Sequence, residues 1–454
     1  MRTAPTRLWI MALVLLVPGL FACGGAGTDS GERPTAVVMI IGDGLGPAQI
    51  AYARRQALEV GERFAFESLP VIGMVSTYSA SNAVTDSAAA ATAFASGVKA
   101  VNGQLGIDPD GNHLKTISEQ ARENGWKIGY VTNTAITHAT PAGFYAHVEN
   151  RYLDADQIAV DLLEQAPDLA LGGGFRDFVS PVDFGRRKDG RNLLDEAREQ
   201  GYTVWNYDSD LGQRPPERLL GLFAGNHLGF ELDRERLPES LRTPPLDQLA
   251  SIALEALGRD GQSFFLLLEG GRIDHAGHDF DAAGVAAQVE AFDRAVQVVL
   301  DYQKEHPDTL ILLTADHATG GLAVNDFVDW AAAERQQASI EWTVSSLQDA
   351  EDPAPAQDVR DWMGYEDLPE ETLEEIRVIG DKYEAARALG NLLAERHGVT
   401  WVPKIDSFNT AGHTGDDVPL YAGGPGAESF SGALDNTEIP QRLGALLGWG
   451  APNG

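Results

Sequence analysis

Short apolar runs alternate with amphipathic stretches along most of this chain, and this alternation constrains the fold more than any other feature. The runs that we predict to be buried strands are residues 36–41, 127–132, 169–171, 263–268 and 309–313. The stretches that we predict to be helices are residues 114–124, 155–165, 246–257 and 282–304. Strands that alternate with helices need crossover connections, which produce a parallel sheet with both faces covered. The sequence therefore predicts an α/β fold, doubly wound, with a largely parallel central sheet and helices on both faces.

An acidic segment interrupts this pattern towards the C-terminus. Residues 331–378 hold thirteen acidic residues against three basic ones. A disordered loop is the alternative, but the segment has side chains that can form a core: Trp342, Trp362, Met363 and Tyr365. We therefore predict an inserted acidic cap at 331–397, which divides a catalytic core into 35–330 and 398–454. We expect the function to lie outside this cap.

The N-terminus has the pattern of an export signal. Arg2 and Arg7 precede an apolar stretch that ends at Ala22, which is typical of a charged region followed by a secretory apolar region. We predict a signal peptide at 1–22 and a flexible tether of small and polar residues at 23–34. The protein is therefore expected to be exported, to the periplasm or the cell surface.

Cys23 is the one cysteine of the chain, so no intrachain disulfide can form. The sequence Leu20-Phe21-Ala22-Cys23 resembles a bacterial lipoprotein signal, in which the cysteine becomes the acylated first residue of the mature protein. The alternative is an ordinary cleaved signal with an incidental cysteine. We expect a lipid on Cys23 to be the protein's contact with the membrane.

The charge of the chain excludes one class of partner and constrains another. Its formal net charge is -33, which disfavours nucleic-acid binding. The same charge repels anionic substrates at long range. A phosphate site in this chain therefore needs local positive charge from metal ions and arginine.

Metal-ligand side chains follow three of the predicted strands. Ligands of parallel sheets collect at the carboxyl ends of strands, so these positions are the ones to inspect. Asp43 follows the first strand between two glycines, and Asp316 and His317 follow the fifth. Asp274 and His278 follow the fourth, four residues apart on one helical face, and this pair suits zinc. Each segment alone also has an ordinary explanation, as a turn, a cap or a surface pair.

Groups that could act on a phosphate occur at three further places. Ser87 begins an alanine-rich stretch, where the helix N-terminus favours an anion, although Thr85 or Asp86 could be a plain helix cap there. Arg151 could bind two phosphate oxygens with its planar fork. His413 lies among small residues that would leave its imidazole accessible.

Taken together, these segments closely resemble the alkaline phosphatase family. The resemblance covers residues 35 to about 426 and keeps the family's order of motifs. It is carried by Gly42-Asp43-Gly44, Thr85-Asp86-Ser87-Ala88-Ala89, Thr140-Pro141-Ala142-Gly143, Arg151, Glu269-Gly270-Gly271-Arg272-Ile273-Asp274-His275, Thr314-Ala315-Asp316-His317 and His413-Thr414-Gly415.

The resemblance implies a site with two Zn2+ and one Mg2+. One zinc would be held by Asp274, His278 and His413, and the second by Asp43, Asp316 and His317. The third ion would take Asp43, Thr140 and Glu269, an all-oxygen set that suits magnesium. Ser87 would be the nucleophile that forms a phosphoserine, and Arg151 would bind the phosphate oxygens. A homodimer is implied as well.

Two positions depart from a pattern that some family members share. Those members carry an aspartate and a lysine where this chain has His138 and His275, and these residues support the third metal and a phosphate-bound water. We therefore assign His138 and His275 to substrate binding. Loss of the carboxylate should weaken Mg2+, and the imidazole could admit Zn2+ at the third site.

Three functions remain compatible with these motifs. The main prediction is hydrolysis of phosphate monoesters, which Ser87, Glu269 and Arg151 favour. A phosphodiesterase of the same superfamily is the main alternative, although such relatives often use threonine as nucleophile and lack the third metal site. An inactive lipoprotein that binds metal or phosphate is the other alternative, although all the predicted catalytic residues are present.

Overall fold

The computed structural model describes residues 33–57, 61–325, 333–402 and 412–454. The described residues form one compact unit. The predicted signal peptide, Cys23 and all but the last two residues of the predicted tether lie outside the described residues. Among the described helices, none is long and apolar enough to cross a membrane.

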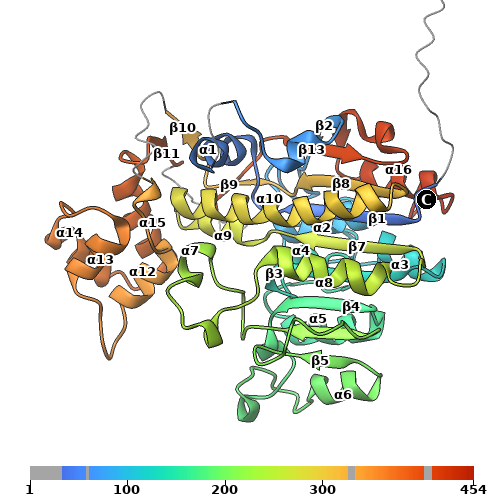
Figure 1. The fold of residues 1–454 in the computed structure, drawn as a ribbon, viewed down its shortest axis with the longest axis horizontal. Coiled ribbons are helices and arrows are strands. Elements are labelled where there is room, and N and C mark those ends of the chain that lie inside the picture. The colour runs from blue at the N-terminus through green and yellow to red at the C-terminus, as the bar shows by residue number, and fades with distance from the viewer. Residues whose placement is uncertain (1–32, 58–60, 326–332, 403–411) are drawn as a thin grey trace, which may run out of the picture. The chain divides into compact units, whose positions relative to one another are not determined.

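The described residues build one large central sheet of ten strands (Figure 1). The strand order is β14-β2-β13-β8-β1-β7-β3-β4-β6-β5, and β13 is the one strand of this sheet that runs antiparallel to its neighbours. The prediction of a largely parallel sheet is confirmed. The strands are β1 (Ala36–Gly42), β2 (Val71–Ser76), β3 (Lys127–Ala135), β4 (Leu169–Gly173), β5 (Thr203–Trp205), β6 (Leu219–Leu222), β7 (Phe264–Glu269), β8 (Thr309–Ala315), β13 (Val418–Gly423) and β14 (Gly432–Asp435).

The central strands explain how distant motifs come together. Every residue of β1, β7 and β8 is buried, which is why these strands appear in the sequence as unbroken apolar runs. In the parallel register, Ile41 of β1 lies beside Glu269 of β7, and Gly42 lies beside Ala315 of β8. The strands therefore deliver Asp43, Glu269 and Asp316 to the same edge of the sheet.

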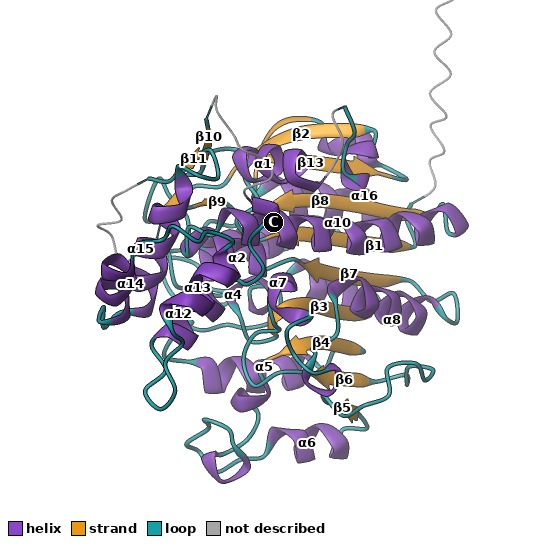
Figure 2. Cartoon of the chain, turned by 60° about the vertical axis from the view of Figure 1, so that its left-hand side comes forward, coloured by secondary structure: helices purple, strands orange, loops and turns teal. Residues whose placement is uncertain are grey.

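Helices cover both faces of this sheet. In the view of Figure 1, α8 and α10 pack side by side in front of it, and α2 and α3 lie behind it. Figure 2 shows the strands between these layers. The helices of the core are α1 (Pro47–Ala57), α2 (Ser87–Ser96), α3 (Ile117–Glu123), α4 (Ala139–Ala142), α5 (Ala155–Gln165), α6 (Leu193–Glu199), α7 (Glu231–Arg234), α8 (Leu246–Gly258), α9 (Arg272–His278), α10 (Ala282–Glu305) and α16 (Glu438–Leu447).

Short elements complete the core. Two pairs of two-residue strands lie outside the main sheet: β9 (Ala318–Thr319) pairs with β12 (His413–Thr414), and β10 (Ala323–Val324) pairs with β11 (Val399–Thr400). The β9–β12 pair matters for the site, because it brings His413 close to the segment that follows β8. The 3-10 turns are η1 (Ala65–Ser68), η2 (Phe175–Asp177), η3 (Pro181–Asp183), η4 (Glu239–Leu241) and η5 (Ala427–Phe430).

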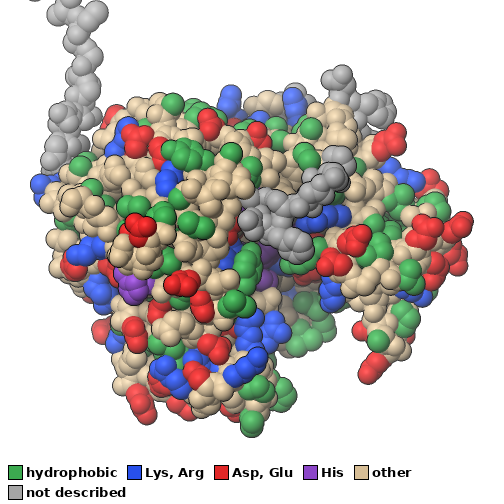
Figure 3. Space-filling model, turned by 180° about the vertical axis from the view of Figure 1, so that it is seen from behind, with side chains coloured by type: hydrophobic (Ala, Val, Ile, Leu, Met, Phe, Trp, Pro, Cys, Tyr) green, Lys and Arg blue, Asp and Glu red, His purple; other side chains and the backbone are tan. Residues whose placement is uncertain are grey.

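The acidic segment folds into helices with a hydrophobic core of their own. Leu373 of the third helix and Leu389 of the fourth are fully buried in this second core, together with Met363. Acidic side chains gather on the outside of this cap, at the right of Figure 3. The helices are α12 (Ile340–Leu347), α13 (Ala356–Met363), α14 (Glu370–Arg377) and α15 (Lys382–Ala394).

Two buried carboxylates of the core hold the N-terminus of α12. Asp233 accepts hydrogen bonds from the Ser339 amide at 2.8 Å and from its hydroxyl at 2.6 Å. Asp281 accepts a bond from the Ile340 amide at 2.9 Å. The first amides of a helix lack partners within the helix. These carboxylates therefore stabilise the N-terminus of α12 and attach the acidic segment to the core.

Candidate active site

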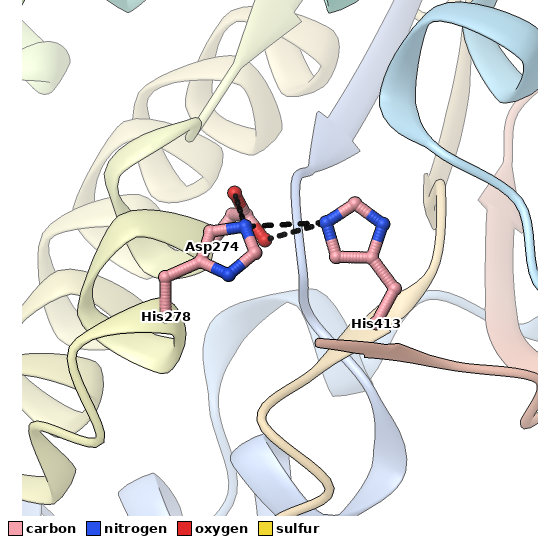
Figure 4. A group of neighbouring side chains, drawn as sticks. All are labelled: Asp274, His278 and His413. Atoms are coloured by element: carbon pink, nitrogen blue, oxygen red, sulfur yellow. Dashed lines mark hydrogen bonds and ion pairs between the residues drawn. The ribbon is translucent and has the colours of Figure 1, made fainter. Parts of the chain in front are cut away.

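Asp274, His278 and His413 converge on one point, as Figure 4 shows. Asp274 and His278 lie one turn apart on α9, with His278 Nε2 at 3.1 Å from Asp274 Oδ2. His413 Nε2, from β12, lies 3.2 Å from His278 Nε2. His413 Nδ1 lies 3.0 Å from the Thr85 carbonyl oxygen, which can only accept, so Nδ1 donates and Nε2 remains a potential metal ligand.

Asp43, Asp316 and His317 form a second group at the ends of β1 and β8. His317 Nε2 lies 3.1 Å from Asp316 Oδ2 and 3.6 Å from Asp43 Oδ1, and all three side chains are fully buried. Ser87 Oγ lies 3.2 Å from the same ring nitrogen. Two carboxylates and a hydroxyl thus surround one imidazole nitrogen, an arrangement that suits a cation.

A third group shares Asp43 with the second and adds His138 and Glu269. His138 Nδ1 lies 4.0 Å from Glu269 Oε1, and the Thr140 hydroxyl donates to Asp43 Oδ2 at 3.2 Å. The hydroxyls of Thr132 and Thr134 on β3 also donate to Glu269. His138 is therefore a possible ligand here beside its predicted contact with substrate. The roles of the two β3 threonines were missed from the sequence, because a threonine in a strand has no distinctive signal.

The electrostatics of these groups favour bound cations. Burial, followed by the charge of Asp316, raises the pKa of Asp43 well above its usual value, and burial raises the pKa of Glu269 to about 7. Asp43 Oδ1, Glu269 Oε1 and Asp316 Oδ2 are buried and have no hydrogen-bond partner among the described residues. Buried carboxylates are costly unless they are paired or bind a metal, so the residues present fit metal ions at the second and third groups.

Ser87 is the first residue of α2, as predicted, and Asp86 is the cap of that helix. Asp86 Oδ1 accepts a bond from the Ala89 amide at 2.9 Å, and Asp86 Oδ2 lies 3.5 Å from Arg151 Nη1. The alternative of an ordinary helix cap is therefore correct for Asp86, and the same carboxylate also contacts the guanidinium of Arg151.

A cavity of about 620 Å³ is lined by members of the first and third groups. Among the predicted site residues, it is lined by His138, Arg151, Asp274, His275 and His278. Further lining residues were not predicted, and they include Asn226, His227, Tyr152 and Arg186 of the core and Asp381 and Tyr383 of the cap. The cap therefore does not lie apart from the site: the start of α15 forms part of the cavity wall. A lone histidine such as His227, in a loop after β6, carries no signal in the sequence.

Comparisons with known proteins show which sequences and folds this chain resembles. The family model for alkaline phosphatase matches residues 35–449. Alkaline phosphatase 3 of Bacillus subtilis (strain 168) is 33% identical over 426 residues, which is 90% of this chain and 87% of the relative. The structure of Thermus thermophilus alkaline phosphatase has a TM-score of 0.80 at 31% identity and covers 96% of both chains.

A third similar structure is a histidine-to-aspartate variant of the TAB5 alkaline phosphatase, from an Antarctic bacterium, with Mg bound. It has a TM-score of 0.68 at 26% identity and covers 92% of this chain and 99% of that chain.

Proposed function

Because the chain belongs to the alkaline phosphatase family, we propose that it hydrolyses phosphate monoesters through a covalent phosphoserine at Ser87. The observation that carries this proposal is the position of the Ser87 hydroxyl. It stands at the N-terminus of α2 and 3.2 Å from His317 Nε2, against a buried carboxylate cluster. A hydroxyl in this place has both the positive end of a helix and a cation site next to it.

The family uses metal ions, and we assign two Zn2+ to this site. Asp274, His278 and His413 would hold one ion, and Asp43, Asp316 and His317 would hold the other. These mixed nitrogen and oxygen sets, without thiolates, suit zinc. Zinc bound there supplies Lewis acidity, which lowers the pKa of a hydroxyl or water and neutralises a leaving alkoxide.

The chain's own residues account for the rest of the reaction. Ser87 Oγ attacks phosphorus, the bond from phosphorus to the ester oxygen breaks, and the alcohol departs. Water then cleaves the phosphoserine, which releases inorganic phosphate and restores Ser87. Arg151 binds two nonbridging oxygens throughout, and Asp86 keeps its guanidinium in place at 3.5 Å.

We assign the third site to Mg2+, with Asp43, Thr140 and Glu269 as its oxygen ligands and His138 as a neighbour that can admit Zn2+ instead. The TAB5 variant that carries aspartate in place of a histidine has Mg bound, and this motivates the following test with His138. The double change His138→Asp with His275→Lys should tighten both magnesium and phosphate and slow maximal turnover. Unchanged magnesium affinity and phosphate inhibition in that variant would contradict the assignment.

Turnover of a phosphate monoester and a diester with the same leaving group, measured on zinc-loaded protein, tests the reaction itself. The proposal predicts fast hydrolysis of 4-nitrophenyl phosphate and slow hydrolysis of bis(4-nitrophenyl) phosphate. The reverse order would identify a phosphodiesterase, and no turnover of either ester would leave an inactive binding protein. Acid-quenched enzyme should carry phosphate on Ser87, and Ser87→Ala should lose at least about a thousandfold in kcat.

We further propose that the protein is exported and anchored by a lipid on Cys23. The support is the N-terminal pattern of charged and apolar residues, which ends in Leu20-Phe21-Ala22-Cys23. Cys23→Ser should release the protein from the membrane fraction without changing its catalysis. An unmodified N-terminus at another residue, found by mass spectrometry, would refute the anchor. The homodimer stays a prediction, which light scattering would test.

A further inference from the structure

His227 lies in the cavity wall beside two histidines already assigned to the site. Its ring centroid is 4.4 Å from that of His275 and 5.5 Å from that of His138, and those two rings lie 5.3 Å apart. All three residues line the same cavity. The position of His227 therefore raises the question of which hydrogen-bonding groups it presents to a substrate.

One hydrogen bond fixes the tautomer of His227. Its Nδ1 lies 3.1 Å from the backbone nitrogen of Ala135, at the end of β3. A backbone N–H can only donate, so Nδ1 must accept and carries no proton. The ring hydrogen therefore sits on Nε2.

The same argument fixes His275. Its Nδ1 lies 2.7 Å from Nη1 of Arg272, and a guanidinium can only donate. His275 must therefore also be neutral, with its hydrogen on Nε2. Neither Nε2 atom has a hydrogen-bond partner among the described residues. Neither atom is fully buried. Both N–H groups are thus accessible, and both residues line the cavity.

Arg272 is held rigidly while it makes this contact. It is 2% exposed, its guanidinium lies 3.7 Å from the centroid of the Phe230 ring, and its Nη2 lies 3.0 Å from Glu341 Oε1 of the cap helix α12. A planar cation fixed on three sides cannot rotate away from His275 without losing these contacts. The cap thereby helps to set the orientation of a residue in the active site.

Resting on the proposed function, we propose that His227 and His275 form a pair of Nε2–H donors that bind the oxygens of the phosphate ester, and that Arg272 positions His275. A dianionic phosphoryl group only accepts hydrogen bonds, so two N–H donors from neighbouring rings of the cavity wall favour its binding. The two imidazoles supply these donors without a charge of their own, next to the permanent charge of Arg151. His227 is then a substrate-binding residue, and Arg272 is a positioning residue.

Two substitutions of His227 separate this role from a structural one. In His227→Asn, the amide oxygen replaces Nδ1 as acceptor for the Ala135 amide, but the donor towards the cavity is lost. In His227→Gln, the longer side chain carries an N–H group to the place of Nε2. Loss of one hydrogen bond to a charged group should weaken inhibition by inorganic phosphate about tenfold in the Asn variant, with an unchanged melting temperature. The Gln variant should recover most of that affinity.

A purely structural role predicts the opposite pattern. His227→Asn would then behave as wild type, and His227→Gln would be the destabilised variant. Unchanged phosphate inhibition in a folded His227→Asn protein therefore overturns the proposal for His227.

Nitrogen-15 NMR of the zinc-loaded protein tests the tautomers directly. We expect unprotonated Nδ1 and protonated Nε2 for both His227 and His275. Arg272→Met should convert His275 into a mixture of tautomers and weaken phosphate inhibition severalfold. A protonated Nδ1 on either ring in the wild-type protein contradicts the proposal. If wild-type protein with full zinc does not turn over 4-nitrophenyl phosphate, the proposed function fails, whereas this spectrum still decides the tautomers.

Discussion

Carboxylates occupy two opposite environments in this molecule, at the edge of the central sheet and on the cap. Asp43, Glu269 and Asp316 are completely buried, although together they carry three potential negative charges. Glu370, Glu371 and Glu374 of α14 are exposed to solvent. The chemical group is the same in both places, but the free-energy cost of its negative charge differs. Water stabilises the charges of the cap, whereas the charges of the site need a cation.

This difference shows why a count of acidic residues says little about function. The cap contains many acidic residues, yet its carboxylates form no candidate metal group among the described residues. The site residues are fewer, and their function depends on the strand ends that hold them. The following experiments change one environment or the other and are ordered by the size of the expected effect.

Removal of metal should have the largest effect, because it exposes the buried carboxylates to one another. Chelation should reduce turnover to background, and added zinc should restore it. Metal that binds the native state with a thousandfold excess over Kd contributes about 4 kcal/mol to stability, so calorimetry should show a clear fall in Tm. Full activity in exhaustively metal-free protein would contradict the account.

The metal-free protein should also depend strongly on pH. Burial raises the pKa of Glu269 to about 7 in the folded state, above its unfolded value, so the folded state favours the protonated form. Stability should therefore be greatest below the unfolded pKa and fall as pH rises towards 7, by about 3 kcal/mol at most. Urea titrations of metal-free protein at pH 5 and pH 8 measure this. Equal stability at the two values would argue against the buried charge.

The junction between the two regions should give an intermediate effect. Ser339→Ala removes the N-cap hydroxyl of α12 and its hydrogen bond to the buried Asp233. This should lower the free energy of unfolding by about 1–2 kcal/mol. Ser345→Ala, on an exposed position of the same helix, is the matched control. Both can be measured by urea denaturation of the zinc-loaded protein. A loss as large in the control as in Ser339→Ala would remove the argument for a specific attachment.

Neutralising the exposed acids should have the smallest effect. The double change Glu371→Gln with Glu375→Gln should alter the free energy of unfolding by less than about 0.5 kcal/mol for each site and leave turnover unchanged. Thermal melts and steady-state kinetics at one salt concentration are sufficient. A large loss of activity would mean that the cap's charge acts on the site.

The sequence predicted those parts of the structure in which local pattern and burial agree. The fully buried strands β1, β7 and β8 were found because each is an unbroken apolar run, and their ends correctly placed Asp43 and Asp316. One helix was predicted too long: α3 begins at Ile117 and not at Leu114, because Thr116 is its cap and accepts a bond from the Glu119 amide at 3.2 Å. Thr116 and Glu119 are visible in the sequence as a helix-start pattern, so this boundary could have been predicted.

Other parts could not be predicted because they depend on tertiary contacts. The edge strand β14 and its neighbour β2 are partly exposed, so neither is the unbroken apolar run of a fully buried strand. β13 is buried, but it is interrupted by Pro419 and runs against its neighbours. His227 and Tyr383 reach the cavity from a loop and from the cap, far apart in the sequence, and no spacing rule connects them. The fold therefore followed from periodicity, whereas the wall of the cavity did not.

The metal content of matched variants tests the central claim most directly. Asp43 belongs to two of the three candidate groups, whereas Asp274 belongs to one. Bound zinc and magnesium, measured by elemental mass spectrometry after gel filtration, should reach three ions in the wild-type protein and in Glu371→Gln with Glu375→Gln. Asp274→Ala should lose one ion and Asp43→Ala two. Equal metal content in wild type and Asp43→Ala would contradict the claim that the buried carboxylates exist to bind cations.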